Sequence, residues 1–243
     1  MNYLELINSV CRRLREPIVG TPSDNAYSLL IGEFVNDAKT YVESKWPWNA
    51  LKDTVNISTV AGTAGYNLLS YNAAKSAAPL REGSRLYTNS EDHKPFVLIY
   101  DSNNSVSRLP IVSDIYQALQ RTQQTLTSTR GRPSVCFFDS IDHDLIESDK
   151  TRLRLNLYPT PDAVYTVQVW AINPQSRLSN ASDVLHVPYL PVILTAHLYA
   201  MYERGEELGE AIGLTSGKAN EALANEISLD QEVSGTDFIF SND

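Results

Sequence analysis

The sequence predicts an α+β protein in which a discontinuous helical-bundle domain, formed by N- and C-terminal segments, holds an inserted antiparallel β-sheet or sandwich domain. Apolar residues recur at helical spacing over residues 1–46 and again after Pro191, whereas residues 54–170 alternate with period two between turn residues. Two amphipathic N-terminal helices need a partner for their apolar stripe, and residues 192–202 are the other strongly apolar helical segment. The two ends of the chain are therefore expected to pack together.

The N-terminal segment predicts two helices. The first is expected over about Asn2–Arg15, where apolar residues fall on one face at spacings of three and four. Prolines and a glycine in residues 17–22 interrupt it, and Ser23 is the expected N-cap of the second helix. The apolar stripe of that helix covers residues 27–42. The helix should end at Trp46, because the proline that follows disfavours a helical backbone in the residue before it.

The central region predicts short strands separated by turns. The segments TVNISTV, RLYT, FVLIY and SVCFFDS have strand character, and AGTAGY forms a turn after the first of them. In Arg152–Trp170, RLRLNLYPTPDAVYTVQVW, two alternating runs flank Tyr-Pro-Thr-Pro-Asp, which predicts a hairpin with a proline-stiffened turn. Ser113–Gln123 is a candidate short helix, and Asn173–Asp183 is a predicted polar loop.

Helical spacing returns at Pro191. Residues 192–202 are apolar almost all round, so this helix is expected to be buried. Three glycines weaken the following turns, and Thr215 or Ser216 is the expected N-cap of a last helix that ends near Asp230.

These elements predict a helical domain, an inserted β domain and an extended C-terminal tail, over residues 1–52 plus 186–232, 53–185 and 233–243 respectively. Cys11 and Cys136 fall in segments of different character. A disulfide between them is possible, but buried free thiols in a reducing compartment are the preferred interpretation.

The net charge of −9 is concentrated in the last quarter of the chain. Acidic and basic residues balance up to residue 180, whereas residues 181–243 hold eleven acidic and two basic residues. Such a segment is typical of a solvated helical face, or of a surface that repels an anion such as DNA. The absence of a basic patch argues against tight nucleic-acid binding, and no apolar stretch approaches the ~18 residues of a membrane span.

No motif supports catalysis, a cofactor or a metal site. The four histidines lie in separate segments, each without a ligand partner at i+3 or i+4. GLTSGKA ends like a phosphate-binding loop, but Ile212 stands where the first glycine belongs and Ala219 replaces the Ser or Thr that would hold magnesium. The sequence therefore predicts a protein that is not an enzyme and needs no cofactor.

Several segments together carry a family resemblance. In order, they are MNYLELINSVCRRLRE, IGEFVNDAKTYVESKWPWNAL, RPSVCFF, LRLNLYPTPDAVYTVQVW and SDVLHVPYLPVILTAHLYAMYERGEELG. The Tyr-Pro-x-Pro-Asp motif and the Pro-x-x-Pro helix that ends in Glu-Arg-Gly-Glu are the most specific. This order resembles the head-to-tail adaptor family of short-tailed bacteriophages, the tail tubular protein A type, over most of Met1–Ile227, with Tyr71–Gln124 matched only loosely.

The resemblance implies a structural virion protein of the tail or neck, assembled in the host cytoplasm. Such a protein forms a closed ring, usually of twelve copies, beneath the portal vertex of the capsid. A tail nozzle or tube protein docks below it, and tail fibres can attach at its side. Genomic DNA passes through the ring during ejection without specific binding, and no membrane is involved.

Residues that the resemblance and the helical pattern nominate for the subunit or portal interface are Tyr27, Phe34, Tyr41, Trp46, Trp48, Glu203, Arg204, Phe238 and Phe240. Acids that could face a DNA-conducting lumen are Glu206, Glu207, Glu210, Glu221 and Glu226. Two alternatives stay open. A non-enzymatic binding module of a phage tail or baseplate, with a carbohydrate- or protein-binding β domain on a helical stalk, predicts an exposed aromatic cluster on the sheet. An enzyme would need convergent titratable groups.

Overall fold

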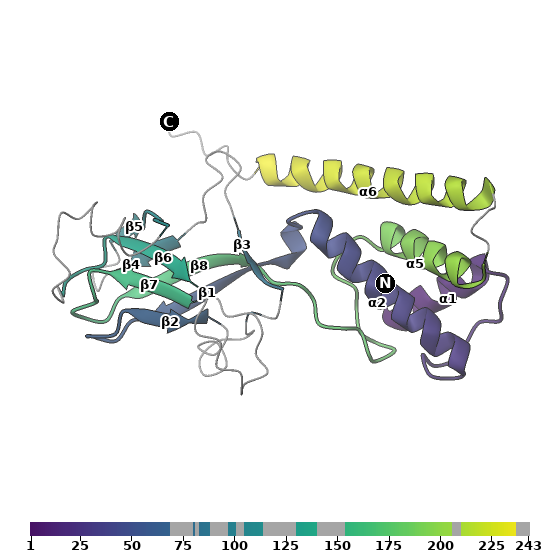
Figure 1. Cartoon of the computed structure of the whole chain (residues 1–243), viewed down its shortest axis with the longest axis horizontal. Coiled ribbons are helices and arrows are strands. Elements are labelled where there is room, and N and C mark those ends of the chain that lie inside the picture. The colour runs from purple at the N-terminus through teal and green to yellow at the C-terminus, as the bar shows by residue number, and fades with distance from the viewer. Residues whose placement is uncertain are drawn as a thin grey trace. The chain divides into compact units, whose positions relative to one another are not determined.

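Figure 1 shows a computed structural model of the chain, in which residues 1–68, 80, 83–87, 97–100, 105–113, 130–139, 154–205 and 210–236 are described. These residues form four α-helices together with antiparallel sheets, which confirms the predicted α+β class. The chain divides into two compact units. The helical unit consists of Met1–Leu51 and Gln175–Asp243, and the β unit consists of Lys52–Pro174.

Helix α1 spans Tyr3–Arg13 and begins with a capping box. The Asn2 side chain accepts a hydrogen bond of 2.9 Å from the backbone N–H of Glu5, whose carboxylate accepts one of 2.9 Å from the N–H of Asn2. This arrangement satisfies two N–H groups that a helix start leaves without intrahelical partners. Helix α1 begins one residue later and ends two residues earlier than the predicted range Asn2–Arg15.

Helix α2 spans Ala26–Lys45. The prediction that Ser23 is its N-cap is wrong. Asn25 is the cap, since its side chain accepts a hydrogen bond of 2.8 Å from the N–H of Ser28. The neighbouring Asp24 instead closes the preceding turn by accepting hydrogen bonds from Thr21. The helix ends at Trp46, which has extended backbone angles before Pro47, as predicted.

Helices α1 and α2 approach closely at Gly32. A Cβ atom added there would collide with the Tyr3 hydroxyl and lie 3.5 Å from Cδ1 of Ile7. Both of those side chains belong to the buried face of α1. Glycine at this position thus allows the two helices to pack with the Tyr3 ring between them.

Helix α5 spans Tyr189–Glu203 and begins two residues before Pro191, which lies in its first turn, where a proline is tolerated. Most of the helix is buried, as predicted, but Tyr202 at its end is 45% exposed. Helix α5 contacts α1, α2 and α6. Helices from both ends of the chain therefore meet around α5 (Figure 1).

Helix α6 spans Glu210–Thr236, so the predicted start at Thr215 or Ser216 is wrong. Residues 233–236, predicted to be part of an extended tail, are helical as well. Two glycines lie in the helix interior and each disfavours it by about 1 kcal/mol. Packing offsets this cost, because Ile212, Ala219, Ala222 and Leu223 are buried. Residues 237–243 of the predicted tail lie outside the described residues.

The β unit contains two sheets. Its strands are β1 (Lys52–Ser58), β2 (Gly65–Asn67), β3 (Arg85–Leu86), β4 (Val97–Tyr100), β5 (Val106–Arg108), β6 (Val135–Asp139), β7 (Arg154–Tyr158) and β8 (Thr166–Ile172). One sheet has the order β1-β8-β4-β5, with β3 also pairing with β8, and the other has the order β2-β7-β6. All named strand pairs are antiparallel. Side chains from both sheets form one core, as in a sandwich.

The predicted hairpin within Arg152–Trp170 is wrong in its pairing, although both of its strands exist. Strand β7 pairs with β2 and β6, whereas β8 pairs with β1, β3 and β4. The buried side chains Leu155 and Leu157 of β7 belong to the same core as Val167 and Val169 of β8. The segment between the strands, which includes a cis Tyr158–Pro159 bond, therefore carries the chain from one sheet to the other.

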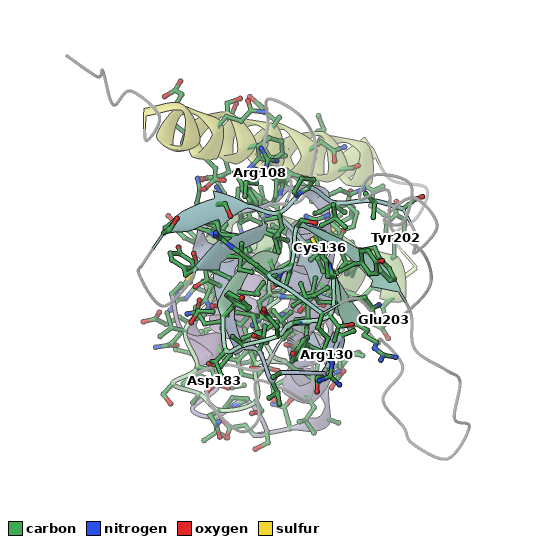
Figure 2. All side chains as sticks on the ribbon, turned by 90° about the vertical axis from the view of Figure 1, so that its left-hand side faces the viewer. Arg108, Arg130, Cys136, Asp183, Tyr202 and Glu203 are labelled. Carbon is green, nitrogen blue, oxygen red and sulfur yellow. The ribbon has the colours of Figure 1, made fainter. Side chains whose placement is uncertain are left out.

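The turn in AGTAGY likewise joins different sheets, because β1 and β2 do not pair with each other. The polar loop predicted at Asn173–Asp183 contains no helix or strand. Cys11 and Cys136 are buried free thiols, as predicted. Cys136 lies inside the β unit, and Arg108 and Arg130 lie at its periphery (Figure 2). The candidate helix Ser113–Gln123 lies outside the described residues except for Ser113, which is not helical.

Candidate interaction site

The loop that leads into α5 is held by polar side chains of α2. The Asn36 side chain accepts a hydrogen bond of 2.8 Å from the N–H of Leu178 and donates one of 3.1 Å to its carbonyl. Further along α2, the Lys39 ammonium donates to the carbonyl of Gln175 at 2.8 Å. The side chain of Gln175 in turn accepts from the N–H of His186 at 3.0 Å. These bonds fix the path of residues 175–186.

A buried ion pair supports the same loop. Lys39 Nζ lies 3.1 Å from Glu43 Oε2, and their side chains are only 3% and 5% exposed. Burial raises the pKa of the Glu43 carboxyl above its ordinary value, and the Lys39 charge opposes this shift. The N–H of Gln175 donates to Glu43 at 3.3 Å. The pair therefore has the additional hydrogen-bond partners that a buried ion pair needs.

The second half of α6 is anchored to the corner that follows α2. The Asp230 carboxylate accepts a hydrogen bond of 2.9 Å from Trp46 Nε1 and one of 3.2 Å from the N–H of Asn49. The Asn49 side chain donates to the Asp230 carbonyl at 3.0 Å. Hydrogen bonds from Trp46 and Asn49 therefore connect α6 to residues 46–49.

An open groove of about 420 Å³ lies beside this anchor. Its buried lining is formed by Trp48, Leu185 and Val187. Three exposed apolar side chains also line it: Met1 at 38%, Tyr189 at 54% and Leu229 at 57% exposure. We call these six residues together the α6 groove.

The α6 groove exists because α6 is much longer than α5. Helix α6 has 27 residues and α5 has 15, which correspond to about 40 Å and 22 Å at ~1.5 Å per residue. Leu229 lies seven residues, or two turns, after the buried Ala222 and so continues the same apolar stripe. Yet Leu229 is largely exposed. Part of the apolar face of α6, at Leu229, is thus only partly covered by the described residues.

The polar lining of the α6 groove limits what it can do. His186, Glu226 and Asp230 also line it, and the carboxylate of Asp230 is held by Trp46 and Asn49. Among the described residues, no group of three or more His, Cys, Asp or Glu could hold a metal ion. The arrangement is suited to receiving apolar side chains.

A second cluster ties the end of α5 to the start of α2. The Arg204 guanidinium donates to Glu16 at 2.6 Å and to the Tyr27 hydroxyl at 2.6 Å. Arg204 and Tyr27 were both predicted as interface residues, and the structure brings them together within one chain. Glu203, beside them in sequence, is exposed.

The other predicted interface residues lie along α2 and the corner after it. Phe34 makes an edge-to-face contact with Tyr199, at a centroid distance of 6.4 Å. Tyr41 lies under the Lys45 ammonium at 4.5 Å. Trp48 is 1% exposed, and its Nε1 donates to the Val42 carbonyl at 2.9 Å, so it forms part of the interior and the groove lining. Phe238 and Phe240 lie outside the described residues.

Two of the predicted lumen acids, Glu221 and Glu226, lie on different faces of α6. Glu221 is exposed and Glu226 is half-buried in the groove lining. Five residues of α-helix separate them by about 140° around the axis. Glu210 is the first residue of α6, and Glu206 and Glu207 lie outside the described residues.

Of the six residues of the α6 groove, sequence reasoning had named only Trp48 as a candidate interface residue. Leu185 and Val187 lie in an irregular segment before α5, and Tyr189 is the first residue of α5, so no apolar period could single them out. One available signal was Leu229, an apolar residue near the end of a helix that is otherwise mostly polar there.

The described part of the chain therefore consists of two compact units, of which the helical unit carries an apolar groove. No helix in this part is long and apolar enough to cross a membrane. The sequence profile described as SU10 adaptor protein matches residues 1–237. The chain belongs to this family of phage head-to-tail adaptors, which confirms the resemblance found in its sequence. A search of curated proteins returns no match.

Family membership identifies the chain as a phage adaptor, a structural component of the virion that interacts with portal and tail components. Structural adaptor families of this kind are generally non-enzymatic.

Proposed function

We propose that the chain is one subunit of a twelve-membered ring that sits beneath the portal and connects the capsid to the tail nozzle or tube. Tail fibres attach at the side of the ring, and genomic DNA passes through it during ejection without specific binding. Assembly takes place in the host cytoplasm. The observation that carries this proposal is the match of the adaptor family to residues 1–237, which spans both units.

The contacts between the helices support a chain organised into a helical domain and a β domain. In this proposal, residues 1–52 and 186–232 act as one discontinuous helical bundle, residues 53–185 act as an inserted β domain, and residues 237–243, which follow α6, act as a C-terminal tail. The contacts of α5 with α1, α2 and α6 favour such a bundle. A bundle built from both chain ends offers a rigid frame for subunit contacts.

A closed ring requires a heterologous interface, in which one face of a subunit meets a different face of the next. We assign much of that interface to residues 23–46 and 191–230, including Tyr27, Phe34, Tyr41, Trp46, Glu203 and Arg204. Exposed apolar side chains on these helices support the assignment, since Leu29, Tyr202 and Leu214 are 52%, 45% and 62% exposed. Such side chains are candidates for burial in a protein contact.

The acidic C-terminal quarter suits a wall that DNA must pass without binding. Lysine or arginine residues on such a wall would release counterions from the phosphates and bind DNA tightly, whereas acids repel it. Among the candidate acids, Glu221 is exposed on α6, which agrees with this role. A map of the ring with α6 on its outer wall would contradict this part of the proposal.

The proposal is tested by electron microscopy of the purified chain, alone and mixed with the portal protein of the same phage. We expect closed rings seated on the portal end that faces the tail. Portals that stay bare at saturating concentrations of the chain would contradict the proposal. Rings that form only with portal present would agree with it, because adaptor subunits can stay monomeric until they meet the portal.

The alternative function, a binding module with an exposed aromatic cluster on its sheet, has no specific observation in its favour. Among the described residues of the β unit, the large apolar side chains that are most exposed are three valines, Val60, Val106 and Val164.

A further inference from the structure

The α6 groove carries negative charge beside its apolar side chains. Glu226 and Asp230, one turn apart on α6, line it, and none of its described lining residues is Lys or Arg. The terminal ammonium of Met1 offsets only one of the two carboxylates. The groove is also preformed, because the N–H of Leu185 donates to the Met1 carbonyl at 3.1 Å and Trp46 holds Asp230. It therefore suits an occupant that combines an apolar side chain with positive charge.

The corner that follows α1 has this complementary chemistry. Its exposed side chains are three arginines and one large apolar residue, namely Arg12, Arg13, Arg15 and Ile18. Ile18 is 62% exposed, and none of the three guanidinium groups forms an ion pair with a described residue. The acid of the corner, Glu16, instead accepts a hydrogen bond of 2.6 Å from Arg204. We call residues 12–18 the basic corner.

Hydrogen bonds hold the basic corner against α1. The Asn8 side chain accepts from the N–H of Val19 at 2.8 Å and donates to the Val19 carbonyl at 3.0 Å. The N–H of Glu16 donates to the Cys11 carbonyl at 2.9 Å. Because these bonds fix its path in the free chain, the corner loses less conformational entropy on docking than a mobile loop would.

The basic corner does not reach the groove of its own chain. None of residues 12–18 lines that groove. Glu16 is bonded to Arg204, which follows the last residue of α5, whereas Tyr189 in the groove lining is the first residue of α5. The 15 residues of this helix correspond to about 22 Å, a length that no side chain spans. An occupant with the chemistry of the basic corner must therefore come from another copy.

Charge also argues against the segment after α6 as the occupant. Residues 237–243 hold two acidic residues and no basic one. Their charge has the same sign as the two carboxylates of the groove, and like charges in contact disfavour binding. The arginines of the basic corner have the opposite sign.

We propose that the basic corner of each copy docks on the α6 groove of the next copy, with Ile18 against the apolar lining and Arg12 or Arg13 beside Glu226. The aliphatic stems of the arginines add apolar contact. The two surfaces differ and lie at opposite ends of α5, so the contact is heterologous and continues from copy to copy around a ring. The proposal deepens the proposed function and rests on it for the presence of a neighbouring copy.

Disulfide trapping tests the contact with the full-length chain. An Ile18→Cys variant is mixed with a Leu229→Cys variant under mild oxidation in the presence of portal. Disulfide-linked dimers are then measured on non-reducing gels. The native thiols do not interfere, because Cys11 and Cys136 are only 1% and 0% exposed.

Two control variants match this pair. Val106→Cys replaces Ile18→Cys at a position that is 51% exposed and close to another arginine, Arg108. Glu221→Cys replaces Leu229→Cys at an exposed position of α6 outside the groove lining. We expect linked dimers of Ile18→Cys with Leu229→Cys and few in either control mixture. Equal linkage in all three mixtures, or none in the first, would overturn the proposal.

A charge exchange gives a second readout. The variant Arg12→Glu, Arg13→Glu should raise the concentration of chain that half-saturates portal by about tenfold, because like charges then face each other. Addition of Glu226→Arg should recover much of that loss. Lys218→Glu reverses an exposed charge outside the groove lining and should leave the concentration unchanged. Circular dichroism verifies that each variant is folded, and a folded triple variant without any recovery would contradict the pairing.

Failure of this contact and failure of the ring give different results. Rings seated on portal in electron micrographs, without preferential linkage between Ile18→Cys and Leu229→Cys, would refute the contact and leave the proposed function intact. Preferential linkage without rings would support the contact and refute the ring.

Discussion

The carboxylate of Asp230 accepts a 2.9 Å hydrogen bond from the indole Nε1 of Trp46, although 184 residues separate the two in sequence. Together with Asn49, this contact fixes the second half of α6 to the corner after α2. It also sets one wall of the α6 groove. The contact joins the N-terminal and C-terminal parts of the helical unit through a polar interaction as well as through apolar packing.

Loss of the Asp230 carboxylate should destabilise the protein. Hydrogen bonds to a charged group contribute about 1.5–3 kcal/mol, so Asp230→Ala should lower the free energy of unfolding by about 2 kcal/mol. Glu221→Ala, an exposed acid on the same helix, is the matched control and should change it by less than about 0.5 kcal/mol. Urea denaturation followed by tryptophan fluorescence measures both. Equal effects of the two substitutions would rule out the anchoring role of Asp230.

The buried pair Lys39 and Glu43 should show strong coupling. Lys39→Met leaves a buried carboxylate without its cation and should cost about 3–5 kcal/mol of unfolding free energy. The double substitution Lys39→Met, Glu43→Leu should recover much of that loss, because it removes the uncompensated charge. A double-mutant cycle by urea denaturation measures the coupling. Additive effects of the two single substitutions would contradict the pairing.

The raised pKa of Glu43 predicts the direction in which the unfolding free energy changes with pH. Burial raises the pKa of this carboxyl above 4.5, so the folded state binds the proton more tightly than the unfolded state does. Its contribution to the unfolding free energy should therefore fall as pH rises from 4.5 through the folded pKa. Glu43→Gln removes this contribution. The difference between wild-type and variant unfolding free energies, measured from pH 4 to pH 8, should decrease with pH, and an increase would contradict the account.

Gly32 should not tolerate a side chain. The Cβ of Gly32→Ala would meet the Tyr3 hydroxyl between α1 and α2, and overpacking of this kind costs about 1–3 kcal/mol. Gly213→Ala in α6 is the matched control, because a Cβ there meets nothing within 4 Å and alanine favours a helix by about 1 kcal/mol. Thermal unfolding should show a lower Tm for the first and a higher Tm for the second. Addition of Tyr3→Phe should recover part of the loss, and equal behaviour of both glycines would refute the close approach.

The thiol of Cys136 should be inert in the folded protein. Burial raises its pKa to about 12, so almost no thiolate is present at neutral pH. Burial also raises the pKa of Cys11. Ellman's reagent should therefore label neither thiol until the protein unfolds, and both in urea. An introduced surface cysteine, Val106→Cys, should react at once, since that position is 51% exposed. Rapid labelling of the native chain would contradict the burial of both thiols.

Much of the fold could be predicted from local patterns in the sequence. Helices α1, α2 and α5 follow from the periodicity of their apolar residues and from the proline after Trp46. These signals act within a few residues. The family resemblance had a similar source, because its most specific motifs lie around Pro159 and in α5. The prediction of Ser23 as the N-cap of α2 was wrong because Asn25 forms a capping box with Ser28.

The errors concern properties that depend on distant residues. The strands around Pro159 were identified correctly, but their pairing was not. Strand β7 pairs with β2, about 90 residues away in sequence, and β8 pairs with β1, about 110 residues away. Pairing over such distances cannot be inferred from the local pattern. The start of α6 was missed because packing against α5 outweighs the helix propensity of its glycines. The α6 groove could not be predicted because it depends on how far α6 extends beyond α5.

The central claim, that this adaptor acts as a twelve-membered ring on the portal, is tested most directly by the mass of the complex in solution. Multi-angle light scattering of portal saturated with the chain should give a mass that exceeds that of portal alone by twelve times 27.1 kDa. A complex whose mass equals that of portal alone, with the chain eluting separately as a 27.1 kDa monomer, would contradict the claim.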